Sequence, residues 1–268
     1  MNNLKTIVLS PGNSGGGSVF EYLATRNDFV SPFNFEEFRM VNDPDGLFDL
    51  YKNCYEKNGM YTSSLAIKRF IEYNSRLNNL RVHSHNKKIK LVKNGYSKII
   101  LDFIKNITNI EYHSNPQFNK IKLNKLDKTK IFINEKINGR LSKKRPFKVI
   151  LPKNQNIFIK EAKILLNKII LNNLRLKKTN KNIVIDQGAN IFYPEKSSIF
   201  YDNRKIIVVT RDPRSVFASM KRRKAYGFPG YDIKLFVRWY EWMINNIYKE
   251  QSNNILRITF EDFIINKN

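Results

Sequence analysis

The stretch from residue 6 to residue 24 constrains the fold more than any other part of the chain. Residues 6–9 (Thr-Ile-Val-Leu) form a short apolar run, which is typical of a buried parallel strand. A glycine-rich segment follows from Pro11 to Ser18, and apolar side chains then recur at helical spacing up to Ala24. This order predicts a strand, a glycine loop and a helix.

The same alternation returns after residue 180. Strands are predicted at residues 182–186, 205–210 and 255–260, and a helix is predicted at residues 231–250. Another helix follows Asp212-Pro213, because this pair suits the N-cap and first position of a helix. Strands that alternate with helices predict a three-layer α/β fold, with a central, mainly parallel sheet flanked by helices.

The middle of the chain is harder to interpret. Residues 29–50 are rich in turn signals and are expected to form a long structured loop. Helices are predicted at residues 61–80 and 155–178. Residues 81–150 are basic and contain short apolar runs such as residues 131–133, which favour a hairpin or a small subdomain. We therefore expect one domain, residues 1–268, with a divergent basic insert at about residues 51–180.

The net charge of +25 is distributed unevenly. Residues 1–60 carry −3, residues 61–200 carry +22 and residues 201–268 carry +6. A surface that faces a polyanion would explain the excess. AT-rich coding would also explain it, because lysine, asparagine and isoleucine are abundant together and the lysines are spread out. We expect no specific nucleic-acid partner, and a non-catalytic polyanion-binding protein stays an alternative.

The remaining composition excludes several classes of protein. Cys54 is the single cysteine, which excludes an internal disulfide and a cysteine-cluster zinc site. His83 and His85 could share a strand face and His113 stands apart, so no metal site is expected. No apolar run approaches the roughly 20 residues that cross a bilayer, and no signal peptide is evident. We expect a cytoplasmic, soluble protein without a transmembrane segment, and contact with an anionic membrane surface stays open.

The glycine loop is a candidate anion site, because backbone N–H groups and the positive end of a helix dipole converge there. Gly12 and Gly17 have the glycine spacing of a Walker A loop. Ser18 and Val19 replace the Lys and Ser/Thr that should follow, so a nucleotide hydrolase would lose its phosphate-bridging lysine and its magnesium ligand. A P-loop kinase or NTPase stays an alternative function, and a plain glycine turn stays the alternative structure.

A second candidate anion site follows the predicted strand at residues 205–210. Arg211 ends this strand, and Ser219 lies eight residues later, two turns into the next helix. Arginine presents a planar fork of donors that suits phosphate, and a serine hydroxyl could reach the same anion. Alternatively, Arg211 pairs with a carboxylate and Ser219 caps or packs.

Together the two segments resemble the sulfotransferases that use 3′-phosphoadenosine 5′-phosphosulfate (PAPS). The first loop of that family, P-x-x-S-G-[ST]-[ST], holds the 5′-phosphosulfate, and residues 11–17 match it here. The family's second motif holds the 3′-phosphate with an Arg and a Ser eight positions later, as in Arg211 and Ser219. Residues 260–263 (Phe-Glu-Asp-Phe) are similar to the family's later strand ending.

The resemblance covers about residues 4–50 and 180–263, and it implies a P-loop NTPase-like fold and a specific chemistry. The implied enzyme moves a sulfuryl group from PAPS to a hydroxyl of a carbohydrate or similar polar acceptor, by in-line transfer and without a metal. The implied cofactor-binding residues are Gly12, Asn13, Ser14, Gly15, Gly16, Gly17, Ser18, Arg211 and Ser219.

The chain also departs from the family pattern. Asn13 stands where the family usually has Lys or Arg, so another cation must act, and Arg39, Lys68 and Arg69 are the candidates. Gly16 and Gly17 replace hydroxyl residues, so binding would rest on backbone amides. The sequence stops before the basic lid that covers the 3′-phosphate in the family. Either the lid is missing, or another basic segment replaces it, or the chain is a fragment.

Glu37 is the predicted general base, and Arg39 is predicted to act beside it. Glu37 follows the glycine loop by about twenty residues, where glycan-modifying branches of the family carry a Glu. Glu36 lies next to it, and paired carboxylates can raise the pKa of one member toward a useful range. The alternative is that both glutamates are solvated loop acids.

Overall fold

The computed structural model describes residues 3–33, 36–78, 95–114, 116, 125–138, 147–174, 180–224 and 227–266. Its centre is a five-stranded sheet in the order β2-β5-β1-β6-β7, and every pairing within it is parallel. The strands are β1 (Lys5–Leu9), β2 (Phe29–Val30), β5 (Asn182–Asp186), β6 (Arg204–Thr210) and β7 (Ile255–Thr259). The predicted parallel sheet is therefore confirmed.

Strand β1 lies in the middle of this sheet, and all five of its residues are buried. Val8 is opposite Asp186 of β5, and Leu9 is opposite Val208 of β6. Because the strands are parallel, the carboxyl ends of β5, β1 and β6 lie together, and we call this end of the sheet the sheet edge. The glycine loop leaves β1 at this edge.

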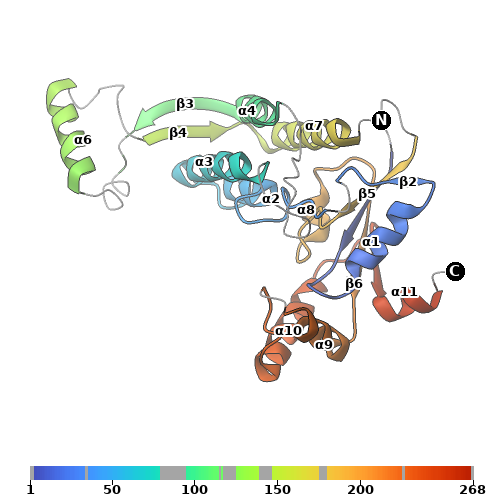
Figure 1. Ribbon diagram of the computed structural model, residues 1–268. Coiled ribbons are helices and arrows are strands. Elements are labelled where there is room, and N and C mark those ends of the chain that lie inside the picture. The colour runs from blue at the N-terminus through green and yellow to red at the C-terminus, as the bar shows by residue number, and fades with distance from the viewer. Residues whose placement is uncertain are drawn as a thin grey trace.

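Helices cover both faces of the sheet (Figure 1). A small cluster on one face joins Val8, Val184 and Val209 to Phe20 of α1, with partly buried side chains from α11. A larger cluster on the other face includes Ile7 and residues of α3, α4 and α7. The helices are α1 (Gly16–Thr25), α2 (Leu47–Tyr51), the π-helix η1 (Lys52–Glu56), α3 (Met60–Leu77), α4 (Tyr96–Ile107), α6 (Lys125–Asn138), α7 (Gln155–Leu174), α8 (Pro194–Ser198), α9 (Pro213–Arg223), α10 (Ile233–Ile247) and α11 (Phe260–Asn266).

The basic middle of the chain forms an arm beside this core. Strands β3 (Thr108–Ser114) and β4 (Phe147–Pro152) pair antiparallel in a separate two-stranded sheet. Figure 1 shows this pair extending away from the central sheet, with α6 at its far end. We call β3, β4 and α6 the β3–β4 arm.

The structure confirms several predicted elements and corrects others. The predicted helices at residues 61–80 and 155–178 correspond to α3 and α7, and Asp212 caps α9 with Pro213 at its start. Residues 81–150 were expected to form a hairpin or a small subdomain, and the antiparallel pair of β3 and β4 includes part of this region. Residues 131–133 do not form a strand of that pair but lie in α6, because a three-residue apolar run fits either element.

Two further boundaries differ from the prediction. The expected loop at residues 29–50 contains the short strand β2 and the start of α2. Phe260 begins α11 and does not end β7. His83 and His85 lie outside the described residues, and His113 is on β3. Among the helices that the structure describes, none is long and apolar enough to cross a membrane.

Candidate functional site

The glycine loop presents backbone donors at the edge of the sheet. Gly15 is the N-cap of α1 with φ 88°, and Asn13 also has a positive φ of 61°. No side chain caps α1, and its first turn contains no acidic residue. The amides of Gly16 and Gly17 lie in that first turn, where N–H groups have no intrahelical acceptor. The loop therefore offers a positively polarised helix end to an anion.

Two aromatic rings pack against this loop. A Cβ on Gly12 would lie 2.1 Å from Cζ of Phe228, and a Cβ on Gly15 would lie 2.3 Å from Cδ2 of Phe260. A larger residue at either position would displace a ring, and at Gly15 it would also be strained by the positive φ. The glycines are therefore needed for packing as well as for backbone conformation.

Arg211 is placed at the same edge, directly after β6. Its guanidinium carbon lies 4.8 Å from the centroid of the Phe260 ring, and its Nε lies 3.9 Å from Oε1 of Glu261. The Nε atom is buried and has no hydrogen-bond partner among the described residues. Because the ring beneath Arg211 also contacts Gly15, the two segments singled out in the sequence lie side by side.

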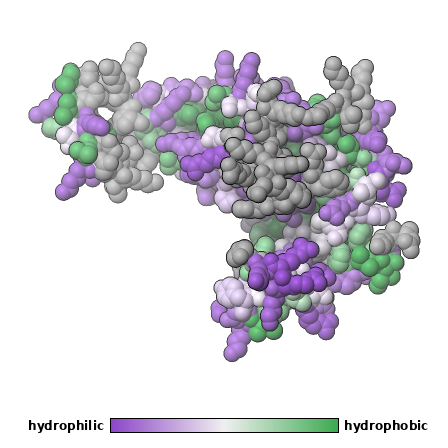
Figure 2. Space-filling model, in the orientation of Figure 1, coloured by the Kyte–Doolittle hydropathy of each residue, from purple (hydrophilic) through white to green (hydrophobic). Residues whose placement is uncertain are grey.

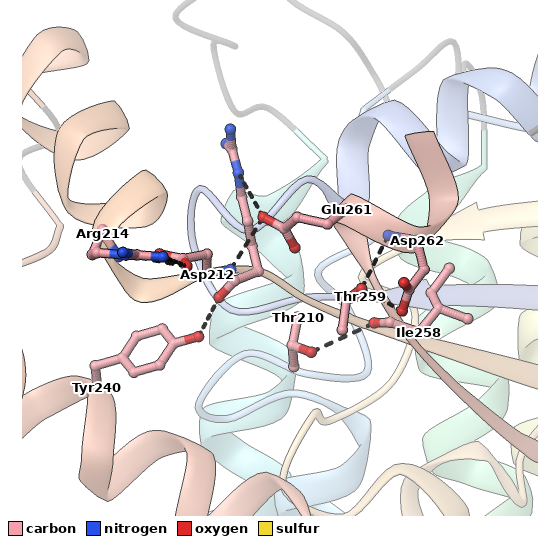
Figure 3. A network of polar contacts seen from close by, with 9 residues as sticks. Thr210, Asp212, Arg214, Tyr240, Ile258, Thr259, Glu261 and Asp262 are labelled. Carbon is pink, nitrogen blue, oxygen red and sulfur yellow. Dashed lines mark hydrogen bonds and ion pairs between the residues drawn. The ribbon is translucent and has the colours of Figure 1, made fainter. Parts of the chain in front are cut away.

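A polar network holds the ends of β6 and β7 together (Figure 3). The backbone N–H of Asp212 donates to Oε1 of Glu261 at 3.2 Å, and the hydroxyl of Tyr240 donates to the carbonyl of Arg211. The side chain of Asp212 is hydrogen-bonded to Arg214, which lowers the pKa of the carboxyl to about 2. These contacts fix the backbone on both sides of Arg211.

Ser219 lies deeper on α9. Its side chain is 7% exposed, and its neighbours Val216 and Met220 belong to the apolar cluster between α9 and α10. No hydrogen bond joins its hydroxyl to another described residue. The structure thus places Ser219 on the helix that starts beside Arg211, but shows no contact between the two side chains.

Asp186 is a site residue to which the sequence assigned no role. Its strand end is fastened to β1, because Gln187 donates from its backbone to the carbonyl of Val8 at 2.9 Å and from its side chain to that of Ser10 at 3.1 Å. Asp186 is 8% exposed, and its Oδ1 is buried without a partner. Burial raises its pKa to about 7, and the negative charge of Glu37 adds to this effect. An acidic residue at the end of a mainly apolar strand was the available signal.

Glu37 lies beside this buried carboxyl. The backbone N–H of Phe38 donates to the carbonyl of Asp186 at 2.8 Å, which sets the segment against the end of β5. Oε2 of Glu37 accepts a hydrogen bond from Nη1 of Arg39 at 3.2 Å, and Nε of Arg39 donates to Asp43 at 2.9 Å. The structure therefore joins the two predicted catalytic residues to each other.

The candidate replacements for a loop cation are all engaged by carboxylates. Arg39 pairs with two acids, Arg69 pairs with Asp45 at 2.6 Å, and Lys68 lies 3.9 Å from Glu72. Within the described residues, no group of three or more His, Cys, Asp or Glu could hold a metal ion. The thiol of Cys54 is buried, which raises its pKa to about 12 and keeps it protonated.

Comparisons with known proteins give similarity to solved structures. No protein-family model matches the chain, and no curated protein matches it. A solved structure described as the sulfotransferase domain from the curacin biosynthetic pathway aligns with 99% of this chain and 69% of its own, at 13% identity and a TM-score of 0.41. A similarity at this TM-score and identity does not establish a function, so the functional proposal is based on the geometry of the site.

Proposed function

We propose that this protein is a PAPS-dependent sulfotransferase that acts on a hydroxyl of a carbohydrate or a similar polar acceptor. The observation that carries the proposal is the Phe260 ring, which contacts Gly15 and lies under Arg211. It brings two candidate anion-binding elements together on adjacent strands at one edge of the sheet. A nucleoside with anionic groups on both its 3′ and 5′ oxygens could contact the two elements at once.

The residues present fit such a donor. The amides that begin α1 would hold the 5′-phosphosulfate, and Arg211 with Ser219 would hold the 3′-phosphate. Arg211 forms an ion pair with Glu261 at 3.9 Å, which is longer than a hydrogen bond, so the donors of the guanidinium are not taken up by this carboxylate. Asn13 is neutral, so the backbone donors and the helix end provide the stabilisation at the loop.

The chain's own groups then supply positioning and proton transfer. PAPS supplies the sulfuryl group. The loop amides stabilise the negative charge that develops during transfer. Glu37 accepts the proton of the attacking hydroxyl, and Arg39, at 3.2 Å, orients the Glu37 carboxylate. Asp186 is a second carboxyl near Glu37, and its pKa is raised by burial and by the negative charge of Glu37.

Calorimetric titration with adenosine 3′,5′-bisphosphate tests this proposal. The protein should bind the bisphosphate in preference to ATP, and Arg211→Ala should weaken binding by at least about tenfold, because a charge-assisted contact is lost. Arg214→Ala is the matched control, since the side chain of Arg214 is 90% exposed and paired with Asp212. Equal or tighter binding of ATP, or unchanged binding by Arg211→Ala, would overturn the proposal.

A further inference from the structure

The helical hairpin of α9 and α10 carries exposed side chains that the proposed reaction does not use. Its exposed cations are Lys221, Arg222, Arg223, Lys224, Lys234 and Arg238. Its exposed apolar side chains are Tyr231, Ile233, Leu235 and Val237, at 83%, 60%, 40% and 55% exposure. We call these ten residues the hairpin surface.

Packing between the two helices explains why these side chains face outward. Val216, Met220 and Phe236 are buried in one apolar cluster between α9 and α10. Ile233 and Val237 lie one turn apart on the outer side of α10, beside Lys234 and Arg238. Figure 2 shows hydrophilic side chains gathered over this lower part of the molecule, with apolar ones next to them. The apolar side chains on the hairpin surface are therefore not packed in the buried cluster between the two helices.

The cations of the hairpin surface have no ion-pair partners in the part of the chain that the structure describes. Asp212 and Asp232 are N-caps, and their carboxylates accept backbone N–H groups of α9 and α10. Cations in the last turn of α9 stabilise that helix end. Lys234 and Arg238 lie in the first half of α10, where the helix dipole gives a cation no benefit.

Composition does not account for these cations either. Three of the six cations on the hairpin surface are arginines, whereas only eight of the 35 basic residues before residue 200 are. A bias toward lysine codons would not enrich arginine in one part of the chain. The hairpin surface is therefore distinct from the scattered lysines of the β3–β4 arm.

We propose that the hairpin surface docks on an anionic lipid bilayer. The cations contact lipid headgroups, while Tyr231, Ile233 and Val237 enter the interfacial layer. Exposed apolar and aromatic side chains interleaved with cations are the pattern of interfacial binding. A soluble polyanion would use the cations, but it would leave the aliphatic side chains in water. This inference does not depend on the proposed sulfuryl transfer.

Cosedimentation with vesicles tests the inference, using phosphatidylcholine with or without phosphatidylserine. The protein should bind only the vesicles that contain phosphatidylserine. Each cation near such a surface strengthens binding about fivefold, so Arg222→Gln with Arg223→Gln should weaken it about 25-fold. Ile233→Ser with Val237→Ser should weaken it at least about fivefold, because the inserted apolar area is lost.

Matched controls come from α7. Lys160→Gln with Lys168→Gln removes the same charge from exposed positions, and Ile164→Ser with Leu171→Ser removes aliphatic side chains that are 37% and 42% exposed. Neither pair should change vesicle binding, and all variants should keep the far-ultraviolet spectrum and the thermal unfolding midpoint of the parent.

Three results would overturn the inference. The first is equal binding to both kinds of vesicle. The second is heparin binding that is lost with Arg222→Gln and Arg223→Gln, together with vesicle binding that Ile233→Ser and Val237→Ser do not change. This combination would identify a soluble polyanion as the partner. The third is a dimer in gel filtration that these serine substitutions dissociate, because a second copy would then cover the surface.

Discussion

The sheet edge and the β3–β4 arm use charged residues in opposite ways. At the edge, Arg211 lies over an aromatic ring, and Asp186 is enclosed with one carboxyl oxygen unpartnered. On the arm, Lys148 and Glu111 form an ion pair with side chains 49% and 43% exposed. Most of the net charge lies in the middle of the sequence, whereas the candidate site contains only a few charged groups. The two regions therefore differ in how closely their charged groups are enclosed by the fold.

The largest effect should come from Glu37→Gln. A general base contributes about 10²–10⁴-fold, so transfer of labelled sulfate from PAPS to a panel of oligosaccharides should fall by at least about 100-fold. Binding of adenosine 3′,5′-bisphosphate should stay within about twofold. Glu36→Gln is the matched control and should keep the rate. A Glu37→Gln variant as active as its parent would rule out this carboxylate as the base.

Asp186→Asn should change the dependence of stability on pH. The folded protein holds a proton on Asp186 up to a pKa of about 7, whereas the unfolded chain releases it near pH 4. Stability from this group is therefore present at low pH and is lost as the pH rises to about 7. At pH 8 the variant should be more stable than the parent by roughly 4 kcal/mol, and at pH 4 the two should be similar.

Urea unfolding at both pH values measures this difference. Asp102→Asn, on the exposed side of α4, is the control and should follow the parent protein at each pH. If Asp186→Asn also follows the parent, the carboxyl is ionised in the folded state and is not the buried acid described above.

Two alanine substitutions in the glycine loop test the packing at the sheet edge. Gly15→Ala should destabilise the fold by about 2 kcal/mol, because φ is +88° and the new Cβ meets the Phe260 ring. Gly17→Ala meets nothing within 4 Å and should be neutral or stabilise by about 0.5–1 kcal/mol. The thermal unfolding midpoints of the two variants should therefore differ, with Gly15→Ala lower than Gly17→Ala. Equal midpoints would contradict the contact between Gly15 and the Phe260 ring.

The smallest effect is expected on the arm. Lys148→Gln should change the free energy of unfolding by less than about 1 kcal/mol, because exposed ion pairs contribute little. Chemical denaturation of the parent and the variant, at low and high salt, measures it. A loss of several kcal/mol would show that charge on the arm is as tightly placed as charge at the sheet edge.

The sequence predicted those parts of the fold that depend on neighbouring residues. The strands β1 and β6, the glycine loop and the N-cap at Asp212 follow from local patterns, and the structure confirms them. The pairing of β3 with β4 joins segments more than thirty residues apart, so periodicity could not reveal it. The apolar run at residues 131–133 was too short to distinguish a strand from the helix α6 that it belongs to.

The candidate site was predicted only in part. Local spacing picked out Arg211 and the loop, but it gave no sign that Phe260 would connect them. Burial of Asp186 depends on the segment around Phe38 packing over β5, which is a tertiary effect. Arg39 looked like a free cation in the sequence, whereas folding brings it to Glu37 and Asp43.

The strand order has a consequence for how the loop sequence can vary. From β1 the chain passes through α1 to β2 on one side of the sheet, and from β6 it passes to β7 on the other. The connections thus diverge between β1 and β6, and in open α/β sheets ligands bind at such a topological switch point. Because backbone connectivity sets its position, a change of individual loop side chains does not move it. A neutral Asn13 and the glycines at positions 16 and 17 are therefore compatible with the proposed binding site.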